Sequence, residues 1–78
     1  MRLHLSHDLI VAIRRPQNMY LRRMIESLFT DPRPDWAMPV AGEKDRFEFV
    51  AAGLWVQYKI DRTGGETIIK AIIIEPPF

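Results

Sequence analysis

The sequence predicts an α+β domain in which a short N-terminal strand and a helical hairpin pack on a small antiparallel sheet. Residues 46–74 alternate between polar and apolar side chains in three runs separated by turn residues. Residues 17–29 instead carry apolar side chains at the spacing of one helix face. Helices that precede a run of consecutive strands are typical of α+β domains, where they cover one face of the sheet.

The N-terminal residues predict a short strand followed by a helix. Polar and apolar residues alternate over residues 2–5, which would direct Leu3 and Leu5 toward the core. Ser6 can cap a helix, because its hydroxyl can accept a hydrogen bond from a backbone N–H two or three residues later. We therefore expect the first helix over residues 7–15.

Pro16 divides the helical segment. A proline inside a helix removes a hydrogen bond and clashes with the preceding turn, whereas the first turn tolerates it. We expect a second helix over residues 17–29, with an apolar face formed by Leu21, Met24, Ile25 and Leu28. One long helix kinked at Pro16 is the alternative. The hairpin is favoured because two short helices cover a sheet better than one rod.

The segment before the sheet predicts an irregular connection. Thr30-Asp-Pro-Arg-Pro-Asp35 ends the helix, because residues before proline avoid the α conformation. Residues 36–44 contain a proline and a glycine and predict a loop that crosses to the sheet. Its first part, Trp36-Ala-Met-Pro39, is apolar for a loop. It could anchor a segment of a partner or cover the core at the sheet edge.

The rest of the chain predicts three antiparallel strands, over residues 46–51, 54–61 and 66–74. The turns between them are Ala52-Gly53 and Arg62-Thr-Gly-Gly65, where glycine can adopt positive φ without steric cost. The last strand is rich in isoleucine on both faces, which fits a strand flanked on both sides or packed in a dimer. Pro76-Pro77 should end it.

Composition and charge exclude several classes of protein. The 78 residues predict one domain, which buries only about 60% of its unfolded surface or slightly more. The absence of cysteine excludes disulfides and cysteine-based zinc sites and fits a cytoplasmic location. No run approaches the ~20 apolar residues of a membrane span, so we expect no membrane association. The net charge of +1 argues against binding nucleic acid through bulk electrostatics alone.

The order of the elements and two short motifs resemble the ribosome-dependent toxins of the RelE/ParE superfamily. Residues 25–32, Ile-Glu-Ser-Leu-Phe-Thr-Asp-Pro, are similar to the end of that family's second helix. Residues 46–61, which begin Arg-Phe-Glu-Phe and end Tyr-Lys-Ile-Asp, resemble its central hairpin. The similarity covers nearly the whole chain. It implies a RelE/ParE-like fold, a role as the toxin of a bacterial toxin–antitoxin pair, and an antitoxin-like partner that wraps the helices and the sheet edge.

The resemblance also implies a site for messenger RNA on the sheet. Active members of the family orient mRNA with basic residues and Tyr or His, on the sheet and at the chain end. The candidate catalytic residues here are Arg46, Lys59 and Lys70, whose charges could stabilise a developing phosphorane. The candidate RNA-binding residues are Arg46, Trp55, Lys59 and Arg62, with Trp55 able to stack on a base. We expect no cofactor and no metal.

The chain departs from the family pattern where that chemistry is expected. Glu48 stands where a second basic residue would be expected and would repel phosphate. Trp55 follows Gly53 in a position where active members usually carry arginine. The chain ends Ile74-Glu-Pro-Pro-Phe78, without the further basic residue of those members. These departures favour a toxin-like protein that has lost canonical ribonuclease activity.

Each candidate residue also has a purely structural interpretation. The face with Arg46, Trp55 and Lys59 could be covered by the helices or by another subunit, with Trp55 in the core. His4 and His7 could bind a metal, but two histidines without a third ligand favour surface or capping roles. The helical segment also carries four arginines that could form an anion-binding ridge or a solvated helix flank, namely Arg14, Arg15, Arg22 and Arg23.

Three functions stay open at this level. The first is a toxin-like component that acts on the ribosome or on mRNA. The second is a catalytically silent binding module of the same fold, or a homodimer assembled through the isoleucine-rich last strand. This strand would promote aggregation if it were left as an exposed edge of the sheet. The third is a general RNA- or ribosome-binding protein, whose affinity should depend strongly on salt.

Overall fold

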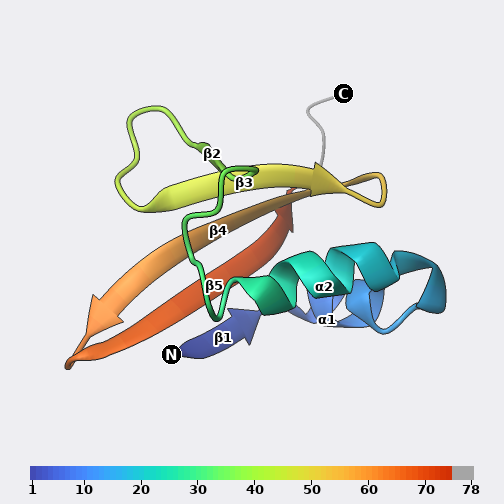
Figure 1. Cartoon of the computed structure of the whole chain (residues 1–78), viewed down its shortest axis with the longest axis horizontal. Coiled ribbons are helices and arrows are strands. Elements are labelled where there is room, and N and C mark those ends of the chain that lie inside the picture. Colours follow the sequence, from blue (N-terminus) through green and yellow to red (C-terminus); the bar gives the residue numbers. More distant parts are fainter. Residues whose placement is uncertain (75–78) are drawn as a thin grey trace.

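The computed structural model describes residues 1–74 and has two layers, a pair of helices packed on a five-stranded sheet (Figure 1). In chain order the elements are β1 (Arg2–Leu5), α1 (His7–Ile13), the 3-10 helix η1 (Pro16–Asn18), α2 (Met19–Ser27), β2 (Met38–Pro39), β3 (Arg46–Ala51), β4 (Leu54–Thr63) and β5 (Glu66–Ile74). The predicted α+β class is therefore confirmed. None of these helices is long and apolar enough to cross a membrane. The predicted strand end at Pro76-Pro77 lies outside the described residues.

The strand order is β1-β5-β4-β3-β2, and the sheet is mixed. Strands β2 to β5 form an antiparallel meander, which confirms the predicted antiparallel arrangement of the three long strands, whereas β1 joins the sheet parallel to β5, a pairing that the sequence did not predict. The reason is that the chain leaves β1 through the helical layer, and a strand that has no hairpin to its neighbour is free to pair in parallel. Strand β5 is flanked on both sides, as the isoleucine pattern predicted. Because β1 occupies its outer edge over Ile68–Ala71, β5 is not an exposed edge strand at these four residues.

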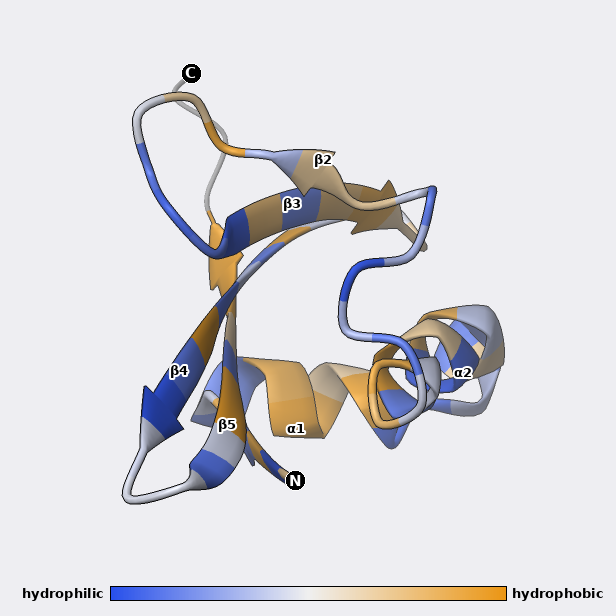
Figure 2. Ribbon diagram, turned by 60° about the vertical axis from the view of Figure 1, so that its left-hand side comes forward, coloured by the Kyte–Doolittle hydropathy of each residue, from blue (hydrophilic) through white to orange (hydrophobic). Residues whose placement is uncertain are grey.

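The two helices form the predicted hairpin rather than one kinked helix. The Ser6 hydroxyl accepts a hydrogen bond from the Leu9 N–H at 3.3 Å and caps α1 as expected. The backbone is extended at Arg15, with φ −77° and ψ 130°, and Pro16 opens η1. Both α-helices are shorter than predicted, because the chain between them reverses through η1. Figure 2 shows α1 and α2 lying together on one side of β4 and β5.

A two-residue strand, β2, was missed by the sequence analysis, which predicted only a loop there. Met38 pairs with Glu48 and Pro39 with Phe47 on the outer side of β3. Proline lacks a backbone donor and is therefore tolerated on a strand at the edge of a sheet. Strand β4 is also two residues longer than predicted, since it reaches Thr63 and leaves only Gly64 and Gly65 in the turn.

The core lies between the helices and one face of the sheet. It includes the predicted apolar face of α2, and its members are Leu9, Ala12, Leu21, Ile25, Leu28, Ala37, Phe47, Phe49, Ala51, Val56, Tyr58, Ile60, Ile69 and Ala71. Leu3 and Leu5 pack against it as predicted. Tyr58 is 1% exposed, and its hydroxyl donates a 2.7 Å hydrogen bond to the Pro32 carbonyl. This bond ties the connection after α2 to the centre of the sheet.

We expect Tyr58→Phe to destabilise the protein at pH 7 by about 1 kcal/mol, because the Pro32 carbonyl loses its donor. Burial raises the pKa of Tyr58 to about 12, with Asp31 adding to the rise and Arg33 opposing it. The folded protein thus holds this proton more tightly than the unfolded chain, whose tyrosine pKa is about 10. The stabilisation is complete below about pH 10 and is lost as the pH rises toward 12.

Urea unfolding of wild type and Tyr58→Phe between pH 7 and pH 11.5 checks this expectation. The difference in unfolding free energy between the two proteins should narrow above about pH 10. Tyr20→Phe is the matched control, because Tyr20 is 70% exposed and its hydroxyl makes no hydrogen bond within residues 1–74. The expectation would be contradicted if the difference in unfolding free energy between wild type and Tyr58→Phe did not change with pH.

Candidate nucleic-acid interface on the sheet

One face of the sheet is left uncovered by the helices, and we call it the open face. Directly paired residues of neighbouring strands share a face, so the register assigns its members. They are Arg2 and His4 of β1, Met38 of β2, Arg46, Glu48 and Val50 of β3, Trp55, Gln57, Lys59 and Asp61 of β4, and Ile68, Lys70, Ile72 and Ile74 of β5. None of these residues is buried within residues 1–74. The interpretation that the helices cover this face, with Trp55 in the core, is therefore wrong.

The open face brings the three candidate catalytic residues into one line. Arg46 pairs with Lys59, and Lys59 pairs with Lys70, so these cations lie side by side on three adjacent strands. We call them the cation row. At about 4.8 Å between strands, the row spans roughly 10 Å at the backbone. Like charges directly opposite each other destabilise a sheet, so the cation row lowers the stability of the folded protein.

Acidic neighbours compensate the two ends of the cation row but not its centre. Arg46 Nε lies 3.8 Å from Glu43 Oε2, and Lys70 Nζ lies 3.5 Å from Asp61 Oδ2. Lys59 forms no ion pair with any residue in the described part of the chain. A hollow of about 230 Å³ lies against the row. An anion bound in this hollow would therefore gain most electrostatic energy beside Lys59, at the centre of the row.

Arg46 is further positioned by a hydrogen bond across the hairpin. Its Nη1 donates to Gln57 Oε1 at 2.8 Å, in a partly buried position. Gln57 lies two residues before Lys59 on β4, so both side chains are on the open face. The bond holds the guanidinium beside the hollow.

Trp55 and Glu48, the two departures from the toxin pattern, contact each other. The indole Nε1 of Trp55 donates to Glu48 Oε2 at 3.2 Å. Trp55 lies four residues from Lys59 along β4, a distance of about 13 Å at 3.3 Å per residue. The open face therefore has a cationic part and an aromatic part, with Gln57 and Glu48 between them.

The other candidate residues are placed differently. Arg62 is three residues from Lys59 on β4 and points to the opposite face, so the structure does not bring it to the cation row. His4 pairs with Lys70 and extends the row onto β1, where its Nε2 accepts a hydrogen bond from Arg2 Nη2 at 3.0 Å. His7 lies at the start of α1. No group of three or more possible metal ligands occurs within residues 1–74.

Arg22 of α2 and the loop tryptophan Trp36 have structural partners. Arg22 pairs with Glu26 on the same helix at 2.9 Å, which is typical of a solvated helix flank. The Trp36 ring packs edge-on against Phe49 with 4.9 Å between ring centroids. Trp36 therefore covers the core at the sheet edge, one of the two roles that the sequence left open, while part of it stays exposed.

Comparisons with models of protein families, with curated proteins and with solved structures found no match to this chain. The RelE/ParE resemblance therefore stays a hypothesis based on the sequence motifs. The open face offers two kinds of chemistry for binding a ligand. Clustered Arg and Lys side chains can bind phosphate and stabilise developing negative charge, and an accessible indole can stack on a base.

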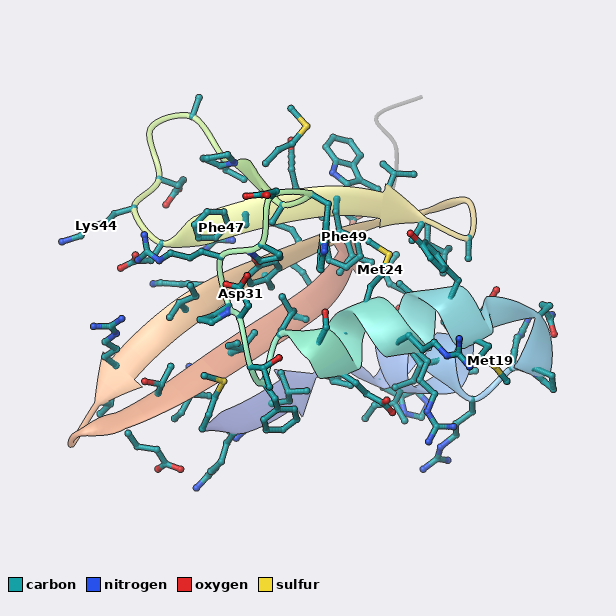
Figure 3. All side chains as sticks on the ribbon, in the orientation of Figure 1. Met19, Met24, Asp31, Lys44, Phe47 and Phe49 are labelled. Atoms are coloured by element: carbon teal, nitrogen blue, oxygen red, sulfur yellow. The ribbon has the colours of Figure 1, made fainter. Side chains whose placement is uncertain are left out.

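We expect Lys59→Gln to raise the stability of the protein by about 0.2–1 kcal/mol at low salt, because Lys59 is flanked by cations on both sides. The gain should vanish near 1 M salt, where the screening length is about 3 Å. Thermal unfolding at both salt concentrations measures it. Lys44→Gln is the control, since Figure 3 shows Lys44 on the loop before β3, pointing away from the sheet. A loss of stability in Lys59→Gln at low salt would contradict this account of the row.

Proposed function

We propose that this chain is a toxin-like protein of the RelE/ParE type that binds single-stranded RNA on the open face of its sheet. The observation that carries the proposal is the cation row with Trp55 on the same uncovered face. A basic surface that binds the backbone, combined with an aromatic side chain that stacks a base, is the usual solution for single-stranded nucleic acid. The order of strand, helical hairpin and meander supports the toxin-like part.

The geometry favours a strand of several nucleotides over a single phosphate ligand. The cation row and Trp55 are about 13 Å apart along β4, which corresponds to about four stacked nucleotides at 3.4 Å each. One end of such a strand would place phosphates at Arg46, Lys59 and Lys70. The other end would place a base on Trp55, whose indole is held by Glu48.

Binding is better supported than cleavage. Attack by a 2′-hydroxyl needs a base as well as cations that stabilise the phosphorane. The Glu48 carboxylate lies beside Trp55 and already accepts a hydrogen bond from the indole N–H. His4 is the one imidazole on the open face within residues 1–74, and it is bonded to Arg2. We therefore propose an RNA-binding protein with little or no ribonuclease activity, directed at mRNA or the ribosome and neutralised by an antitoxin-like partner.

A catalytically silent protein-binding module is the second candidate, and one observation favours it. The aromatic part of the open face includes large apolar side chains that are unusually exposed, with Val50 at 71% and Met38 at 65%. Exposed apolar residues that gather on one surface are typical of protein interfaces. In this case the chain would have no affinity for RNA.

Binding of a fluorescently labelled single-stranded oligouridylate tests the main proposal. The affinity should fall as the salt concentration rises. In a plot of log affinity against log salt concentration, the slope should be less steep than that of the wild type by about 0.7 for Lys59→Ala and for Lys70→Ala, because each variant loses one phosphate contact. Trp55→Ala should lose about 1–3 kcal/mol of binding free energy, which is roughly 5- to 150-fold in affinity. Lys44→Ala should bind as the wild type does. Absence of binding at low salt, or an equal effect of Lys44→Ala, would count against the RNA site.

Expression of the chain in a bacterial host tests the toxin-like part. We expect slower growth and reduced protein synthesis, since bound mRNA would be blocked on the ribosome. Arg46→Ala should relieve the effect, because Arg46 is the positioned cation of the row, whereas His4→Ala and His7→Ala should have little effect. Unchanged growth and translation on expression of the wild-type chain would contradict a toxin-like role.

A further inference from the structure

A pocket lies at one end of the core, between α1, η1 and the turn that joins β3 to β4. Figure 1 shows the connection between the helices and the β3–β4 turn at the same end of the molecule. The pocket has a volume of about 350 Å³, within the range of about 300–1,000 Å³ that is usual for small-molecule sites. We call it the end pocket.

The wall that α1 contributes carries opposite charges at its two ends. Asp8, Val11 and Arg15 all line the pocket and follow one another at intervals of three and four residues, so they lie along one side of the helical segment. At 1.5 Å per residue, the backbones of Asp8 and Arg15 are roughly 10 Å apart. Neither side chain forms an ion pair within residues 1–74. Both charges are therefore available to a ligand.

The wall that the sheet contributes is apolar. Leu54 of β4 and Ile73 of β5 are partly buried and pack against the core beside the pocket. Ala52, in the β3–β4 turn, also lines the pocket and has a φ of 53°. This conformation costs free energy for alanine, and glycine or asparagine is usual in such a turn. Strained residues of this kind gather at functional sites.

Two side-chain amides complete the polar lining. The Asn18 Nδ2 donates a 2.9 Å hydrogen bond to the Ala12 carbonyl, which positions the amide and leaves its oxygen as an acceptor. Gln17 lines the pocket next to it in the chain. A side-chain amide both donates and accepts hydrogen bonds, so this pair can bond to the N–H and C=O groups of a peptide.

We propose that the end pocket binds a short free peptide of about three residues, with its amino terminus at Asp8 and its carboxylate at Arg15. An extended peptide spans about 3.3–3.6 Å per residue, so three residues match the distance of roughly 10 Å between the two charges. A guanidinium binds a carboxylate through two parallel hydrogen bonds, and the Asp8 carboxylate accepts from an ammonium group. An apolar central side chain would lie against Leu54 and Ile73.

Other ligands match the end pocket less well. A polyamine would leave Arg15 without a partner, and a nucleotide would place its phosphate near Asp8, which repels it. An internal segment of a protein has no charged termini for the two ends. Leu54 and Ile73 pair with Ala51 and Val56 of the core, so the end pocket lies on the helix side of the sheet. The proposal therefore goes beyond RNA binding on the open face and does not depend on it.

Isothermal titration calorimetry with the tripeptide Ala-Leu-Ala, with both termini free, tests the proposal. We expect saturable binding of one peptide per chain. Acetylation of the amino terminus and amidation of the carboxyl terminus should each weaken binding roughly tenfold or more, because each removes one charged partner. The compound 8-aminooctanoic acid separates an amine and a carboxylate by the same number of chain bonds but has no amides, and it should also bind more weakly.

Matched variants assign each terminus of the peptide to its residue. Arg15→Gln should weaken the free peptide roughly tenfold but bind the amidated peptide as the wild type does. Asp8→Asn should behave in the same way toward the acetylated peptide. The controls are Arg14→Gln and Asp35→Asn, because both residues are exposed and neither lines the pocket. Both controls should bind the free peptide as the wild type does, and circular dichroism verifies that all four variants are folded.

Several results would overturn the proposal. One is the absence of saturable binding of Ala-Leu-Ala, and another is equal binding of the free peptide and its blocked versions. An equal loss in Arg14→Gln and Arg15→Gln would show attraction by general charge instead of a site. If Arg15→Gln weakens oligouridylate as much as Lys59→Ala does, the pocket belongs to the RNA surface. Peptide binding without any RNA binding would support the end pocket and reject only the RNA site.

Discussion

Val56, Tyr58 and Ile60 project from β4 into the core, where they meet the apolar faces of α1 and α2. Because side chains alternate along a strand, burying these three residues sends Trp55, Gln57 and Lys59 to the other side of the sheet. Two short helices can cover only one face of a five-stranded sheet. The other face is therefore open as a direct consequence of how the core is built, and the cation row and Trp55 lie on it.

The open face is costly for a protein of this size. A small domain has a thin core, and its stability is a small difference between large opposing contributions. Even so, Lys59 is held between two other cations, and Val50 and Met38 are largely exposed to water. Both features would be unfavourable on a surface without a ligand. Together they are the reason that we propose the open face as a binding surface.

The sequence predicted those parts of the fold that depend on local rules. Alternation and glycine turns located the three long strands, and Ser6 and Pro16 located the start of α1 and the break between the helices. The parallel pairing of β1 with β5 was not predictable in this way, because it joins residues more than sixty positions apart. Strand β2 was missed because two residues that include a proline carry no strand pattern.

The same distinction applies to the candidate site. Alternation alone places Trp55 and Lys59 on one face. Arg62 was predicted in the turn after this strand, but β4 continues to Thr63 and directs Arg62 to the other face. The alignment of Lys59 with Arg46 and Lys70 required the register of two hairpins. The addition of His4 required the pairing of β1 with β5. The RelE/ParE resemblance itself stays a prediction, since no comparison tests it.

The pairing of β1 with β5 also has a consequence for the time at which the protein becomes folded. Residues 2–5 are synthesised well before residues 68–71, which are their neighbours in the sheet. Contacts between such distant residues slow folding, because the chain must close a long loop before the contact stabilises it. At synthesis rates of about 5–20 residues per second, the N-terminal strand waits roughly 3–14 s for its partner. The sheet, and with it the open face, is therefore completed only after β5 has been synthesised.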